Sequence, residues 1–151
     1  MNQAILMAHV FSGMVCIVAG VWVFVDVLHV NEANQARIRT VSWVAAVAMW
    51  LAFVIAGYWY AVFYKADKAV ILKGPWPFSH SFFMETKEHL VIILLLLATY
   101  LPIVASNGLA GNRDARRIML WVAGLIVLLG LMMDGDGGII AMGVKMGLMK
   151  K

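Results

Sequence analysis

Cysteine, proline and charged residues are scarce in this sequence. Its 151 residues include one cysteine and three prolines, and only 13% of them are charged. The single cysteine, Cys16, excludes an internal disulfide and a metal site built from several thiolates. Soluble domains usually carry about 25% charged residues, so this composition argues against a soluble domain.

Long apolar runs take the place of charge, since 64% of the residues are hydrophobic. A helix needs about 20 mostly apolar residues to cross a bilayer. Four segments are long enough, and we predict helices over residues 4–30, 39–64, 81–105 and 116–133. We therefore expect an all-α protein, an integral membrane four-helix bundle that forms one domain over residues 1–151.

The polar segments between these runs predict the topology. With four spans, the N-terminus, residues 65–80 and the C-terminal tail lie on one side of the membrane. The stretch 134–138, Asp-Gly-Asp-Gly-Gly, is expected to break the fourth helix, which leaves residues 139–151 as a short interfacial helix. No Lys or Arg precedes the first run and no clear cleavage site follows it, so we expect a retained helix rather than a signal peptide.

Positive charge flanks the predicted spans, and the formal net charge is +4. Every lysine falls on the side that holds both termini, and every arginine falls on the opposite side. Charges in these positions suit anionic lipid headgroups, so we expect a lipid bilayer as the partner and no nucleic acid.

Ionisable side chains inside the apolar runs are costly and so are functional candidates, among them His9 and His89. His9 lies about one and a half turns into the first helix, and His89 lies about two turns into the third. Both helices start from the same side, so the two imidazoles reach a similar depth. Haem iron can be held by two such side chains, one on each face. We therefore predict haem b between these helices, with His9 and His89 as axial ligands.

Several neighbours of these histidines fit a bulky cofactor. Gly13 and Gly20 share a helical face with His9 and leave space there, although small residues at this spacing also favour close helix packing. Glu85, one helical turn before His89, could orient its ring by hydrogen bonding. Lys87 could bind a haem propionate. The prediction is a haem protein for electron transfer or redox sensing.

A divalent metal site is the first alternative. Carboxylates and imidazoles suit transition metals, and several are expected on the side that holds both termini: His80, Glu85, Glu88, His89, Asp134 and Asp136. His80 is also a reserve ligand for haem, or simply a surface histidine in an aromatic loop. This alternative predicts a metal-ion binding or transport protein.

The second alternative is a structural subunit of a larger membrane complex or a homo-oligomer, in which packing satisfies the histidines. Whether the protein is an enzyme stays open.

Asp26 and His29 form a further pair at the other end of the first helix. They are spaced to share a helical face, and we expect them to interact with Arg37, Arg39 or Arg116 at the membrane interface. The alternative roles are a second haem ligand or a proton-transfer step.

The pattern loosely resembles small bacterial four-helix membrane cytochromes of the b type and CopD-like membrane families. The resemblance is carried by His9 and by the segment Glu85-Thr86-Lys87-Glu88-His89. It implies haem b, electron transfer, a quinone or a redox protein as partner, and a multi-pass location in the bacterial cytoplasmic (inner) membrane. The second and fourth predicted helices contain no histidine, so the sequence departs from the relatives that hold two haems.

Overall fold

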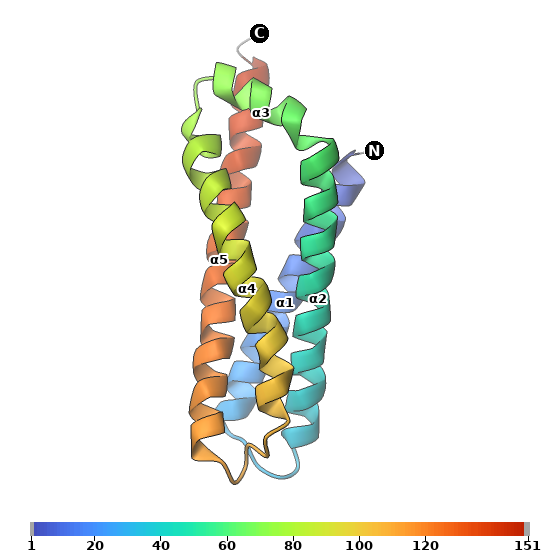
Figure 1. Ribbon diagram of the computed structural model, residues 1–151, viewed down its shortest axis with the longest axis vertical. Coiled ribbons are helices and arrows are strands. Elements are labelled where there is room, and N and C mark those ends of the chain that lie inside the picture. The colour runs from blue at the N-terminus through green and yellow to red at the C-terminus, as the bar shows by residue number, and fades with distance from the viewer. Residues whose placement is uncertain (1, 150–151) are drawn as a thin grey trace.

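The structure, a computed structural model, describes residues 2–149. These residues form helices joined by short connections, and they contain no strand. Four long helices run side by side along the bundle axis: α1 (Asn2–Leu28), α2 (Gln35–Val62), α4 (Glu85–Ala105) and α5 (Arg113–Met149). A short helix, α3 (Tyr64–Lys73), and a π-helix, η1 (Ser79–Met84), connect α2 to α4 (Figure 1). The predicted all-α class is confirmed.

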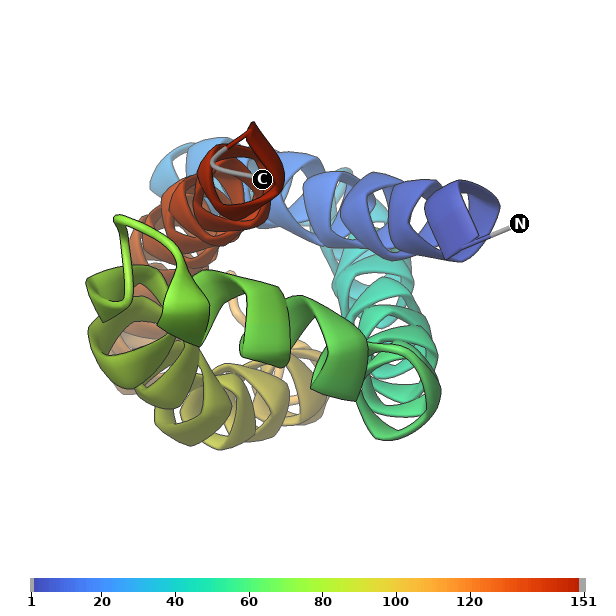
Figure 2. The same cartoon turned by 90° about the horizontal axis from the view of Figure 1, so that it is seen from above.

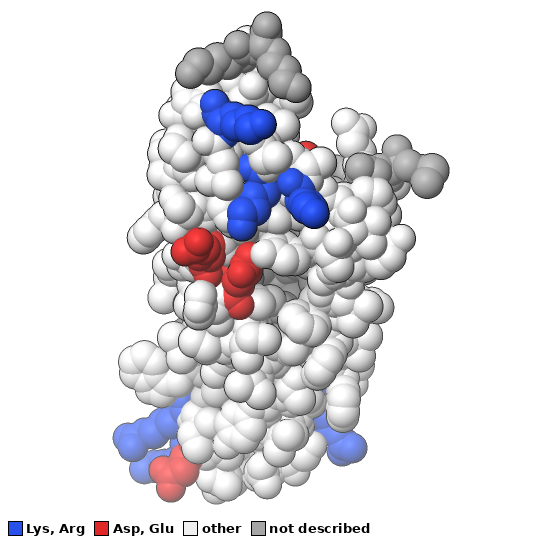
Figure 3. Space-filling model, turned by 45° about the horizontal axis from the view of Figure 1, so that its top comes forward, with Lys and Arg blue, Asp and Glu red and all other residues white. Residues whose placement is uncertain are grey.

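The four predicted apolar runs are all helical. The helical segments that are long and apolar enough to cross a membrane are Gln3–Leu28, Gln35–Val62, Ser79–Ala105 and Arg113–Met149. On the face seen in Figure 3, charged side chains lie in the upper half and at the lower end, with an uncharged belt between them. This distribution is typical of helices that span a bilayer.

The long helices form a ring in the order α1, α2, α4, α5, seen from above in Figure 2. Two loops, residues 29–34 and 106–112, lie together at one end of the bundle, which we call the loop end. The beginning of α1, the end of α5, and α3 with η1 lie at the opposite end, which we call the α3 end. Both chain ends thus lie on the same side, as predicted.

Side-chain hydrogen bonds hold the loop end. The Asn34 amide donates to the carbonyl oxygens of Asp26 and His29, both at 3.2 Å, and so ties the start of α2 to the end of α1. Arg37 donates to both carboxylate oxygens of Asp26, at 2.7 and 2.8 Å. The predicted partner of Asp26 is therefore confirmed as Arg37. The His29 ring is exposed and bonds to the Val25 carbonyl instead.

Helix α5 corrects one prediction from the sequence. It continues for 37 residues through Asp134–Gly138 to Met149, so the predicted helix break and the separate interfacial helix are wrong. The part of α5 beyond these glycines packs closely against α3 and η1, which holds the helix continuous. A Cβ atom at Gly147 would lie 2.7 Å from the Val70 side chain and carbonyl oxygen, so glycine permits α5 to approach α3. At ~1.5 Å per residue, the helix reaches beyond a bilayer core of ~30 Å.

Helix α3 is an element that the sequence analysis did not predict. Tyr64 and Ile71 lie on its buried face, while its lysines lie toward the surface. The segment Gly74-Pro75-Trp76-Pro77 follows it, and the next helical segment begins at Ser79 rather than at residue 81.

Buried apolar side chains form two clusters. The larger one fills the bundle toward the loop end and includes Val23, Ile38, Leu101 and Ile126 among its members. The smaller one lies beneath α3 and comprises the buried residues Tyr64, Ile71, Met84 and Ile140. The candidate site lies between the two clusters.

Candidate functional site

A cavity of about 610 Å³ opens between the helices in the half of the bundle near the α3 end. Every helical element contributes to its wall, which is mainly apolar. Cys16, Leu94 and Ile126 line its deepest part, where the larger apolar cluster begins. The volume falls in the range of about 300–1,000 Å³ that is typical of sites for small molecules and cofactors.

His9 places an oriented imidazole on this wall. Its Nδ1 lies 3.0 Å from the carbonyl oxygen of Ala52 on α2. A carbonyl oxygen only accepts hydrogen bonds, so Nδ1 carries the proton and Nε2 of the neutral ring keeps a free lone pair. A backbone carbonyl that fixes the histidine tautomer in this way is common behind metal-ligating imidazoles.

Lys87 brings an ammonium group to the same cavity. It is half-buried on α4 and reaches toward α5, where a Cβ atom at Gly137 would lie only 3.0 Å from its Nζ. Asp134 of α5 also lines the cavity. Among residues 2–149, the Asp26–Arg37 pair is the only ion pair within 4.0 Å, so Lys87 and Asp134 are near each other without direct contact.

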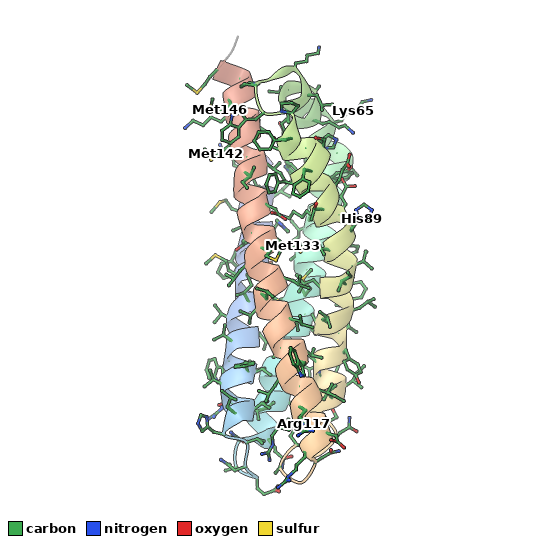
Figure 4. The ribbon with its side chains drawn as sticks, turned by 90° about the vertical axis from the view of Figure 1, so that its left-hand side faces the viewer. Lys65, His89, Arg117, Met133, Met142 and Met146 are labelled. Atoms are coloured by element: carbon green, nitrogen blue, oxygen red, sulfur yellow. The ribbon has the colours of Figure 1, made fainter. Side chains whose placement is uncertain are left out.

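His89 lies outside the cavity. Its side chain is exposed, and it points away from the bundle in Figure 4. Its Nδ1 donates to the backbone carbonyl of Glu85 at 2.6 Å, so the carboxylate of Glu85 does not take the orienting role that we predicted. Side chains two residues apart point ~200° apart around a helix, so His89 faces outward whereas Lys87 faces inward. The structure therefore does not bring His9 and His89 to one site.

His80 is buried in η1, with 5% of its surface exposed, so it is not the surface histidine that the sequence suggested. Its Nδ1 lies 3.0 Å from the hydroxyl of Tyr64, the first residue of α3. Burial raises the pKa of the Tyr64 hydroxyl, which therefore stays protonated. This bond holds α3 against η1. Sequence reasoning missed it because the partners are 16 residues apart across a turn.

The remaining predicted residues divide between the cavity and other places. Gly13 lines the cavity, and a Cβ atom there would meet nothing within 4 Å. Gly20 instead packs against α5, where a Cβ atom would lie 3.2 Å from Val127. Glu88 lines the cavity, whereas Glu85 lies with His89 in a shallow outer groove.

The acids and histidines do not assemble into a metal site. Within residues 2–149, no three His, Cys, Asp or Glu side chains gather closely enough to hold a metal ion. Asp136 is absent from the cavity wall that Asp134 lines, and His80 bonds to Tyr64. The set of six metal ligands suggested by the sequence is therefore not formed as one site.

The cavity wall also includes Trp59, Tyr60 and Asp67. Trp59 and Tyr60 line it from the end of α2. Asp67 lines it from α3, and burial raises the pKa of this carboxyl group. Sequence reasoning missed Asp67 because it did not predict the helix over residues 64–73 that places this side chain on the cavity wall.

The cavity thus combines an apolar wall, one oriented imidazole, one ammonium group and the carboxyl groups of Asp67, Glu88 and Asp134. These features suit a ligand that is large and apolar but carries an anionic group for the ammonium or an electron-pair acceptor, such as a metal ion, for the free imidazole nitrogen. No protein-family model, curated protein or solved structure matches this chain.

Proposed function

We propose that this chain is a multi-pass membrane protein. Four helices have the necessary length and hydropathy, and many large apolar side chains face outward, among them Trp121 with 74% of its surface exposed. Soluble monomers rarely expose so much contiguous apolar surface, whereas a bilayer would cover it. The resemblance to small bacterial cytochromes suggests the bacterial cytoplasmic membrane as its location.

We further propose that the cavity binds haem b, with His9 as an axial ligand, and that the protein serves electron transfer or redox sensing. The observation that carries this proposal is the His9 ring, which keeps Nε2 free on the wall of an apolar cavity of about 610 Å³. A bound haem would supply reversible one-electron chemistry, and the protein would supply the ligand and an apolar surrounding.

The other donors of the cavity fit the same group. Lys87 is a cation that suits a propionate, and the apolar wall suits the porphyrin. Met84 and Met133 also line the cavity, and a thioether is a known axial ligand of haem. The placement of His89 on the outer surface favours ligation by His9 without His89.

An absorption spectrum of the protein purified in mild detergent, after expression with haem available, tests this proposal. We expect a Soret band that is lost in His9→Ala and retained in His89→Ala. The exposed His89 is a matched control, because both substitutions remove one imidazole from an apolar helix. Absence of the band from the unmodified protein, or its loss in His89→Ala with retention in His9→Ala, would sink the proposal.

A further inference from the structure

The ammonium group of Lys87 has no bonded partner among the residues that the structure describes, although it is half-buried. A charge inside an apolar helix bundle is costly unless it is paired or serves a ligand. Gly137 leaves room for the group on α5, and the cavity gives it access to a ligand. The site is therefore built to receive an anionic group.

The shape of the cavity indicates the route to Lys87. Helix α3 crosses the end of the bundle above the cavity, and its Asp67 lines the wall (Figure 2). The sides are more open, since Leu6 of α1, Tyr60 of α2 and Ile92 of α4 line the cavity and are also exposed. These residues belong to the helices that we propose to face lipid. A ligand dissolved in the bilayer can therefore enter sideways between the helices.

We propose that Lys87 binds the carboxylate of an amphipathic ligand that enters from the bilayer. The apolar part of the ligand lies along the deep wall formed by Cys16, Leu94 and Ile126. The carboxylate has two possible sources, a haem propionate or a free long-chain acid. The first source rests on the proposed function, and the second does not.

Asp134 makes this site selective. It lines the same cavity as Lys87 and forms no ion pair with it. A second carboxylate is repelled by Asp134 and attracted by Lys87, so the ligand binds only where the ammonium group is the nearer charge. Removal of the Asp134 charge should therefore strengthen carboxylate binding and leave a neutral ligand unaffected.

The test compares acids with neutral analogues on haem-free protein in detergent. One arm titrates oleic acid against oleyl alcohol, and the other titrates haem against its dimethyl ester. We expect the unmodified protein to prefer the charged member of at least one pair by roughly tenfold, as charge-assisted hydrogen bonds allow. Lys87→Met should abolish that preference, whereas Lys65→Met, which removes an exposed lysine of α3, should retain it.

Equal binding of charged and neutral members in both arms would overturn the inference, as would a preference that survives in Lys87→Met. Should that variant fail to fold, Asp134→Asn decides, because unchanged carboxylate affinity in it contradicts the site. A Lys87-dependent preference for oleic acid with no haem binding supports the carboxylate site while the proposed function fails. A preference confined to haem over its ester assigns the carboxylate to a propionate.

Discussion

The two halves of this bundle are built from similar helices but packed in opposite ways. Toward the loop end, α1 and α5 are in contact, since Gly20 lies against Val127 and Phe24 lies against Gly124. Toward the α3 end the same helices diverge, and a cavity takes the place of a continuous core (Figures 1 and 2). The loop-end half thus provides the packing, and the other half provides a binding site.

Glycines on the contacting helices show what separates the halves. A Cβ atom added at Gly20 or Gly130 would have neighbours within 3.3 Å, whereas one added at Gly13 would have none within 4 Å. Gly13 and Gly20 share one face of α1, yet only Gly20 serves close packing. A glycine on a membrane helix can therefore mark either a helix contact or the wall of a cavity.

The largest effect is expected when leucine replaces a glycine at a helix contact. A Cβ atom at Gly130 would lie 2.7 Å from Cγ1 of Ile17, a β-branched side chain with little freedom to move. We expect Gly130→Leu to lower the free energy of unfolding by about 2–3 kcal/mol through overpacking. Thermal unfolding in detergent would measure it.

Gly13→Leu is the matched substitution on the cavity side. It should leave the thermal stability of the ligand-free protein unchanged or slightly higher, because the new side chain meets open space and a helical glycine is removed. It should also weaken ligand binding by filling the cavity. Equal destabilisation by the two leucines would contradict the division of the bundle into a packed and an open half.

The next largest effect is expected at the ion pair of the loop end. The Asp26 carboxylate is buried and accepts two hydrogen bonds from Arg37, whose side chain is 54% exposed. We expect Asp26→Ala to cost about 2 kcal/mol of stability, since two charged hydrogen bonds are lost while Arg37 stays hydrated. Glu32→Ala, which removes an exposed acid from the adjacent loop, should change stability much less.

A smaller effect is expected at the attachment of α3. Tyr64→Phe keeps the buried ring but removes the hydroxyl that bonds to His80. We expect a loss of about 1 kcal/mol, because the His80 nitrogen then lacks a partner in a buried place. Proteolysis near residues 64–80 should become faster. Tyr58→Phe, at an exposed tyrosine, is the control, and an equal loss there would show that the Tyr64 bond contributes nothing.

Much of the fold could be predicted from hydropathy because a membrane span needs only length and apolar composition. The exceptions are places where tertiary packing overrides local preference. The glycines of 134–138 predict a break, yet α5 stays helical because its later residues pack against α3 and η1, where Gly143 and Gly147 permit a close approach. Helix α3 escaped prediction because it is short and polar, and its buried face is formed by few residues.

The sequence could indicate individual residues of the candidate site, but it could not show how residues of different helices come together. His9, Gly13 and Lys87, which the sequence indicated as cofactor-binding candidates, all line the cavity. The choice of His89 as the second ligand depended on depth, and depth does not specify the direction of a side chain. Rotation around α4 places Lys87 inside and His89 outside, and a helix considered alone lacks the neighbours that fix this rotation.

The smallest predicted effect is the pH dependence of stability that Asp67 causes in the half of the bundle that holds the cavity. Burial raises the pKa of Asp67 above its ordinary value, so the folded protein binds its proton more tightly than the unfolded chain does. The contribution of Asp67 to stability therefore falls as pH rises from its unfolded pKa through its folded pKa. Asp67→Asn should be slightly more stable than the unmodified protein at neutral pH, and the gain should vanish in acid. Asp114→Asn, at an exposed acid of the loop end, should show no such gain, and a gain at Asp67 that does not depend on pH would contradict desolvation as its cause.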